Sequence, residues 1–172
     1  MTDAQRRFLL VDQCLVGGAI NFVLNAAIVW YLFRALEQVP MTGGSQNILG
    51  DVVGTFFLLP LILGLIVTGL VRRQVRSGKL AALQWDRTSH PLYRRLPASS
   101  FPRALILAIV CTILLGLPLF GLAAALGVTS VPYWDFVVAK GTYSGALAAA
   151  VGPVVAYAAL GDPGPDEATA AT

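Results

Sequence analysis

Apolar residues fall in four long, nearly uninterrupted blocks, which are separated by shorter polar segments. The blocks cover about residues 9–33, 52–71, 104–126 and 136–160. An α-helix needs about 20 predominantly apolar residues to cross about 30 Å of hydrocarbon, and each block meets that length. The pattern therefore predicts an all-α, polytopic membrane protein, with a four-helix transmembrane bundle as a single membrane domain over residues 1–161.

The segments outside the blocks are few and uneven in charge. Residues 72–103 form the longest connection and are rich in arginine, whereas residues 162–172 are short, acidic and rich in proline. We expect this C-terminal tail to be disordered, because it has too few apolar residues to form a core. The whole chain is 56% hydrophobic and 12% charged. Soluble domains carry about 25% charged residues, so the composition also favours a membrane protein.

The basic residues predict the orientation in the membrane. Of the 12 lysines and arginines, only Arg34 and Lys140 lie outside the N-terminal segment and the central connection. Basic residues concentrate in cytoplasmic loops, so we expect both termini and the connection 72–103 to be cytoplasmic. Arginine far outnumbers lysine, and alanine and glycine are abundant. This composition is typical of G+C-rich genes and favours a bacterial plasma (inner) membrane.

The basic connection has two interpretations. It is either a topology determinant that lies on anionic lipids of the inner leaflet, or a docking surface for a cytoplasmic partner or a specific lipid head group. We expect no binding of nucleic acid, because the membrane topology already accounts for the charge. The candidate lipid- or partner-binding residues are Arg72, Arg73, Arg76, Lys79, Arg87, Arg94 and Arg95.

The two halves of the chain align without a gap when one is shifted by 84 residues. The shift places Asp51 on Asp135, each at the start of a predicted span. One interpretation is a duplicated two-helix hairpin, which would give parallel repeats related by an axis along the membrane normal. The other is chance similarity between valine-rich helices. In either case, we expect both aspartates to cap free backbone N–H groups and to meet the positive end of a helix dipole.

Two asparagines interrupt the first apolar block. Asn21 and Asn25 are four residues apart, so they point the same way on a helix. One interpretation is that they hydrogen-bond across helices and hold the bundle together. The other is that they line a polar site, to which the hydroxyls of Thr55, Thr112, Thr142, Tyr143 and Ser144 could contribute. The candidate residues of this intramembrane site are Asn21, Asn25, Asp51, Thr55, Asp135, Lys140 and Thr142.

Lys140 is the one basic residue clearly inside a predicted span. It lies about 7 Å below Asp135 at about 1.5 Å per residue. Its ammonium group could snorkel to the membrane surface, or it could pair with Asp51 of the other half and so mark a functional site. The sequence favours snorkelling, because that arrangement costs less free energy.

The chain lacks the motifs of the common reaction classes. We found no nucleophile–base set, no metal-binding cluster and no phosphate-binding loop. An enzyme is therefore not expected, and neither is a metal or a cofactor. Two function classes remain. The first is a transporter or channel component, which would act as an oligomer because four helices rarely enclose a pore. The second is a scaffold or accessory subunit that packs its small-residue faces against another membrane protein.

Three stretches resemble a known group of proteins. They read "NFVLNAAIVW", "GDVVGTFFLLPLILGLIVTGLVRR" and "FVVAKGTYSGALAAAVGPVVA". In these stretches the chain resembles small bacterial four-span membrane proteins that are often labelled as permeases. The resemblance implies a small multi-pass membrane protein, and the permease label assigns no role to any residue. Of the two function classes we favour the first, a permease-like component that moves a small solute or ion.

Overall fold

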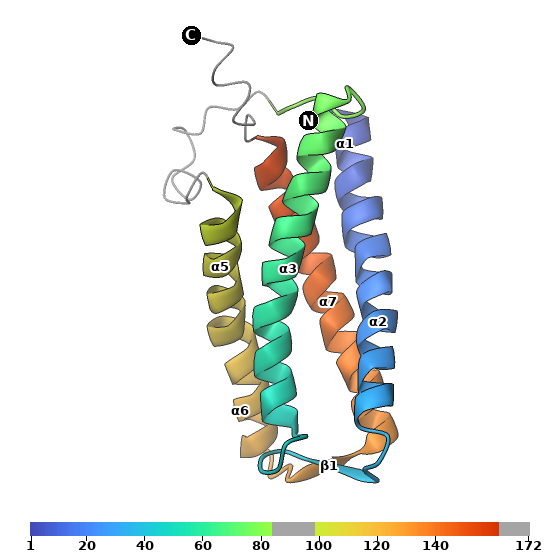
Figure 1. Cartoon of the computed structure of the whole chain (residues 1–172), viewed down its shortest axis with the longest axis vertical. Coiled ribbons are helices and arrows are strands. Elements are labelled where there is room, and N and C mark those ends of the chain that lie inside the picture. The colour runs from blue at the N-terminus through green and yellow to red at the C-terminus, as the bar shows by residue number, and fades with distance from the viewer. Residues whose placement is uncertain (84–98, 162–172) are drawn as a thin grey trace.

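Four long apolar helices make up most of the structure (Figure 1). The computed structural model describes residues 1–83 and 99–161. In these ranges, the helices that are long and apolar enough to cross a membrane are Asp3–Leu32, Ile48–Arg76, Ser100–Ala125 and Tyr133–Leu160. The predicted all-α four-helix bundle is confirmed. The predicted tail at 162–172 lies outside the described residues.

Each spanning helix begins a few residues before its apolar block. Polar side chains cap the first two of these helices. Thr2 and Gln5 form a capping box, in which each side chain bonds the other residue's backbone N–H. The second helix, α3 (Ile48–Arg76), begins after Asn47, whose side chain accepts a 2.8 Å hydrogen bond from the Gly50 N–H. The fourth helix, α7 (Tyr133–Leu160), begins directly after Pro132.

The first and third spanning helices each contain a π-helical segment. The first is built from α1 (Asp3–Arg7), the π-helix η1 (Phe8–Val16) and α2 (Gly17–Leu32). The third is built from α5 (Ser100–Cys111), the π-helix η3 (Thr112–Gly116) and α6 (Leu117–Ala125). By contrast, α3 and α7 are continuous α-helices of 29 and 28 residues, although Pro60 and Pro153 lie inside them.

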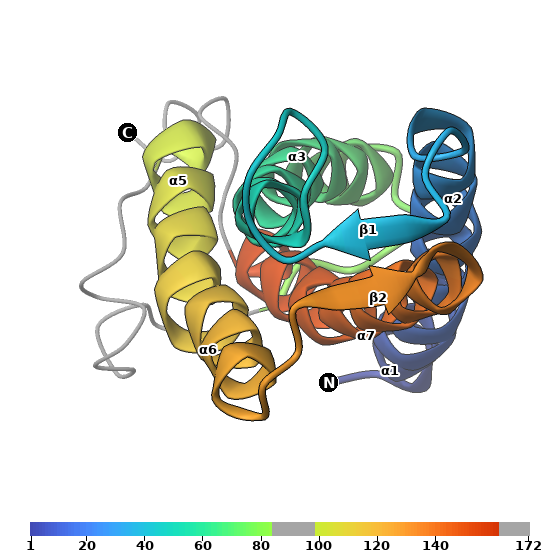
Figure 2. The same ribbon diagram turned by 90° about the horizontal axis from the view of Figure 1, so that it is seen from below.

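Two short strands join the loops at one end of the bundle. Strand β1 (Gln38–Pro40) pairs antiparallel with β2 (Ser130–Pro132), and Val39 lies opposite Val131 (Figure 2). Hydrogen-bonded and non-bonded residue pairs alternate along such a ladder. The flanking bonds from Met41 N to Thr129 O and from Tyr133 N to Glu37 O place both strand prolines at non-bonded positions. Proline fits there because its missing N–H is not needed.

Each half of the chain forms a hairpin of two spanning helices, and the helices of one hairpin pack against those of the other. The first helix of the first hairpin, α2, packs along α7, whereas α5 of the second hairpin packs along α3. The second helices, α3 and α7, pack against each other in the middle (Figure 2). This arrangement follows an approximate two-fold pattern, in which each hairpin supplies one central and one outer helix.

Small residues let the outer helices approach the central ones closely. A Cβ atom added at Gly145 of α7 would lie 3.0 Å from the Gly18 carbonyl oxygen, and one at Gly141 would lie 3.0 Å from the Phe22 ring. One at Gly64 of α3 would lie 2.6 Å from the Ala104 side chain of α5. The small-residue face of the fourth span is therefore covered by the first span of the same molecule.

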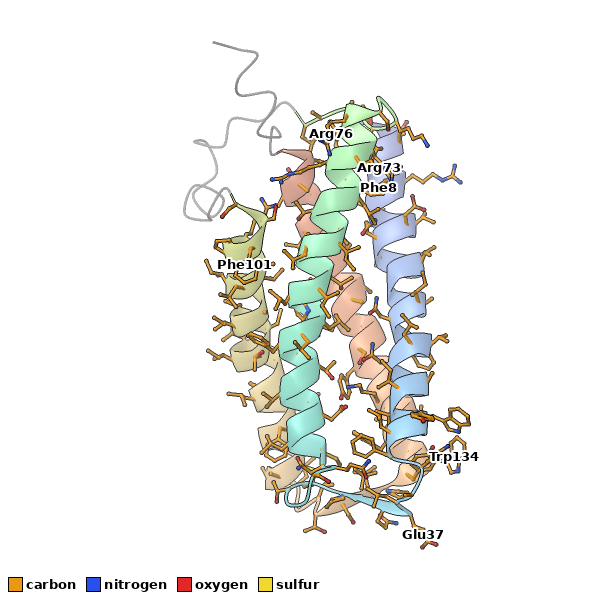
Figure 3. The ribbon with its side chains drawn as sticks, in the orientation of Figure 1. Phe8, Glu37, Arg73, Arg76, Phe101 and Trp134 are labelled. Atoms are coloured by element: carbon orange, nitrogen blue, oxygen red, sulfur yellow. The ribbon has the colours of Figure 1, made fainter. Side chains whose placement is uncertain are left out.

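The two ends of the bundle differ in charge. Arg73 and Arg76 lie at the end that also carries the N-terminus, which we call the basic end, whereas Glu37 and Trp134 lie at the opposite end (Figures 1 and 3). That opposite end, which we call the strand end, carries β1 and β2 (Figure 1).

Candidate functional site

A buried ion pair links the two central helices near the strand end. The Lys140 Nζ on α7 donates a 2.6 Å hydrogen bond to the Asp51 Oδ2 on α3, and it also donates to the Thr55 hydroxyl. The side chain of Lys140 is only 3% exposed, and that of Asp51 is 13% exposed. The predicted snorkelling of Lys140 is therefore wrong. The interior offers the ammonium group both a carboxylate and a hydroxyl, and these partners replace the water that it would otherwise seek at the surface.

A tyrosine completes the polar cluster. The Tyr143 hydroxyl donates a 2.5 Å hydrogen bond to the same Asp51 oxygen. Its ring stacks on Phe56 with the ring centroids 5.6 Å apart, and the Lys140 ammonium lies 5.4 Å from the Tyr143 ring centroid. Hydrogen bonds that involve a charged group are about twice as strong as neutral ones. We therefore describe Asp51, Thr55, Lys140 and Tyr143 as one unit, the polar cluster.

Helix spacing accounts for the way these four residues meet. Asp51 and Thr55 are four residues apart on α3, and Lys140 and Tyr143 are three apart on α7, so each pair shares one face of its helix. From the sequence, Tyr143 is a possible source of a hydroxyl but is not one of the predicted site residues. Its three-residue spacing from Lys140 is the signal that could have identified it.

The prediction that both aspartates cap their helices needs correction. Asn47 caps α3, and the Asp51 side chain is hydrogen-bonded to Lys140 and Tyr143 instead. Asp135 lies in the first turn of α7, where a negative charge meets the positive end of the dipole, but no side chain caps this helix.

Asn21 and Asn25 do not hydrogen-bond across helices within the described structure. Their amide nitrogens donate to carbonyl oxygens one turn earlier on α2 itself, to Gly17 at 2.9 Å and to Asn21 at 3.0 Å. The interpretation that their amides hold the bundle together is therefore not supported, and the packing glycines described above form the contact between α2 and α7.

The asparagines instead face an open groove. It has a volume of about 570 Å³ and runs between α2 and α3, with Lys140 of α7 in its lining. Of the predicted site residues, the groove brings together Asn21, Asn25, Asp51, Thr55 and Lys140. The rest of the lining consists of glycines and aliphatic residues: Leu24, Ile28, Gly50, Gly54, Leu58, Leu59, Ile62, Leu63 and Ile66.

Two predicted residues lie apart from this groove. Thr142 is exposed and donates its hydroxyl proton to the Val138 carbonyl of its own helix, and Asp135 is exposed at the strand end. Ser144, one turn from Lys140, is fully buried, and its hydroxyl has no hydrogen-bond partner among the described residues.

The basic residues lie at the opposite end of the bundle. Arg73, Arg76 and Lys79 are exposed, and Arg72 is half-buried. Arg103 is buried and hydrogen-bonds the Thr68 hydroxyl at 3.4 Å. Three further predicted residues of the basic connection lie outside the described residues: Arg87, Arg94 and Arg95.

The four long apolar helices define the class of this protein, a multi-pass membrane protein, and a polar cluster lies between its two central helices. No protein-family model matches the chain, and neither a curated protein nor a solved structure is detectably similar to it. Its function must therefore be inferred from the chemistry of the site.

Proposed function

We propose that this protein is a permease-like membrane protein in which the groove between α2 and α3 is the path of a small solute or ion. The polar cluster carries this proposal. Ionisable residues within membrane-spanning segments are costly to bury, and they commonly mark the pathways of substrates and ions. Lys140 and Asp51 pair within the bundle and also line the groove. A purely structural pair would need no opening beside it.

The positions of the other polar residues support the same role. Asn21 and Asn25 line the groove while contributing no hydrogen bonds between helices in the described structure. The scaffold alternative is less well supported, because the small-residue face that was expected to bind another protein is already covered by α2. As part of the same proposal, the basic end faces the cytoplasm of a bacterial cell and lies on anionic lipids.

A transport path must be reachable by water from both sides of the membrane, which single cysteines can test. The native thiols are removed by Cys14→Ser and Cys111→Ala, and Gly54→Cys is introduced. Gly54 lines the groove, and a Cβ atom there meets nothing within 4 Å, so the cysteine fits. The protein is reconstituted in one orientation in liposomes. A membrane-impermeant, charged thiol reagent is then applied from outside or trapped inside.

We expect the cysteine at position 54 to react from both compartments, because a transport path opens alternately to each side. Leu114→Cys is the matched control, since Leu114 is 65% exposed on the outer surface of the third spanning helix and should face lipid. The control should react from neither side. Reaction of the cysteine at position 54 from one compartment only, or from none, would contradict the proposed function.

A further inference from the structure

A carboxylate stands on the outer surface of the first spanning helix. Asp12 lies in the middle of the π-helix η1, and its side chain is exposed. It forms no hydrogen bond or ion pair with another residue that the structure describes. Leu15 and Val16, about one turn further along, are 66% and 46% exposed. An acidic group therefore interrupts an otherwise apolar surface.

The ion pair of Asp51 and Lys140 provides a level from which depth in the membrane can be counted. Both α3 and α7 run from the strand end to the basic end (Figure 1). Val71 on α3 and Leu160 on α7 each lie 20 residues beyond the ion pair, so they lie at about the same level. Arg72 follows directly on α3, and basic residues of this kind mark the membrane surface.

Asp12 lies well below that level. Its neighbour Gln13 packs on α7, where a Cβ atom added at Gly152 would lie 3.0 Å from the Gln13 carbonyl oxygen. Gly152 precedes Leu160 by eight residues, or about 12 Å along the helix. The head-group region on each side of a bilayer is about 5–8 Å thick. Asp12 therefore lies several ångströms inside the hydrocarbon.

A carboxylate at this depth needs a cation. Ionisable residues in membrane-spanning segments almost always face the protein interior or a water-filled cavity, and they pair with an opposite charge. Asp12 instead points outwards, and it is not part of the lining of the groove between α2 and α3. Lipid chains offer it neither a charge nor a hydrogen bond. The molecule that covers this surface therefore supplies a lysine or an arginine.

A second copy of the chain is poorly suited to supply that cation. Two copies share one orientation in the membrane, so a two-fold contact through this surface would place Asp12 opposite Asp12, and the like charges would repel. Arg6 and Arg7 lie six and five residues nearer the basic end. Arg103 is buried and hydrogen-bonds Thr68, so it is not available to a neighbouring molecule.

We infer that the surface of η1 around Asp12 binds a membrane-spanning helix of a different protein, and that a lysine or arginine of this helix pairs with the Asp12 carboxylate. The aliphatic residues around Asp12 pack against the partner helix. They also exclude water from the ion pair, which strengthens the attraction. This binding site lies outside the groove, so the inference goes beyond the proposed transport path and does not depend on it.

Site-specific photocrosslinking in the native cell membrane tests this inference. A diazirine amino acid replaces Leu15, and the adducts are identified by mass spectrometry. We expect one main adduct, formed with a membrane-spanning segment of another protein that contains a lysine or arginine. Asp12→Asn should reduce this adduct at least tenfold. Adducts with lipid only, with a second copy of the chain or with its own residues 84–98 would each overturn the inference.

A charge exchange shows whether the two residues form a pair. Replacing the basic residue of the partner helix with glutamate should reduce the adduct as much as Asp12→Asn does. Combining that change with Asp12→Lys should restore at least half of the adduct. An adduct that persists at full strength in Asp12→Asn, or that the exchange does not restore, would contradict the ion pair.

Two controls show that the adduct depends on this surface. Asp135→Asn removes another exposed carboxylate, from the first turn of α7 at the strand end, and should leave the adduct unchanged. A diazirine at Val138, which is 59% exposed on α7, should react with lipid, and an equally strong adduct with the same protein there would overturn the inference. Purified Asp12→Asn should unfold as the unmodified protein does, so that misfolding does not account for a lost adduct.

Discussion

At the level of single residues, the asparagines of α2 and the ion pair beside them have different roles. Asp51 and Lys140 satisfy each other, together with Tyr143 and Thr55. Asn21 and Asn25 bond only to carbonyl groups of their own helix. Those carbonyls already accept the backbone bonds of the helix, so the asparagine bonds add little to stability.

The double variant Asn21→Leu with Asn25→Leu should therefore fold normally. We expect its free energy of unfolding to change by no more than about 0.5 kcal/mol, as is usual for substitutions away from packing contacts. Unfolding by denaturant measures this free energy. If the asparagines bonded across helices, each substitution would instead cost about 0.6 to 2 kcal/mol, and that result would contradict the structure.

The sequence could identify most members of the site but not their arrangement. Asp51, Thr55, Lys140 and the two asparagines stand out as polar residues in apolar blocks. Whether Lys140 snorkels or pairs depends on which face of α7 meets α3, and a single chain does not reveal this. The shift of 84 residues was a misleading guide here, because it treats Asp51 and Asp135 as equivalents. Lys140 aligns with Phe56 in that comparison, so the first half offers Asp135 no cation like the one that Asp51 meets.

At the level of helices and strands, the lengths of the apolar blocks were sufficient to predict the four spans. The block lengths and the caps are local properties, so they can be read along the chain. The exchange of partners between hairpins and the β1–β2 pairing are contacts between distant segments, and no local pattern specifies them. The predicted parallel repeat stays a prediction, although the two-fold pattern of helix contacts is the one that it would produce.

Two glycines of α3 test the close packing of the helices. Gly64 faces Ala104 of α5 and has no room for a Cβ atom, whereas a Cβ atom at Gly69 meets nothing within 4 Å. We expect Gly64→Ala to lower the free energy of unfolding by about 1–3 kcal/mol through overpacking. Gly69→Ala on the same helix should be neutral or raise it by up to about 1 kcal/mol, because alanine favours helix formation. Equal effects of the two substitutions would argue against the contact between α3 and α5.

At the level of the whole molecule, the outer helices leave large apolar surfaces uncovered. No residue of α6 is buried, and Leu122 on this helix is 60% exposed. We propose that copies of the chain associate through the face of α5 and α6, which would leave the groove between α2 and α3 open to the bilayer.

Native mass spectrometry of the protein in lipid nanodiscs tests this association. We expect one fixed stoichiometry above one, and Leu122→Gln should shift the population towards monomer. A strict monomer in lipid would refute the association, while the groove between α2 and α3 of a single copy would be unaffected.

The pairing of Asp51 with Lys140 is the feature on which both the fold and the proposed path depend. A double-mutant cycle with Asp51→Asn and Lys140→Met, read out as the free energy of unfolding, measures it most directly. Removing one partner leaves a buried charge alone, so each single variant should lose about 3–5 kcal/mol. The double variant should be more stable than the sum of the two losses predicts, by at least about 2 kcal/mol. If the two effects add to within about 0.5 kcal/mol, the residues are uncoupled, and Lys140 does not pair with Asp51 inside the bundle.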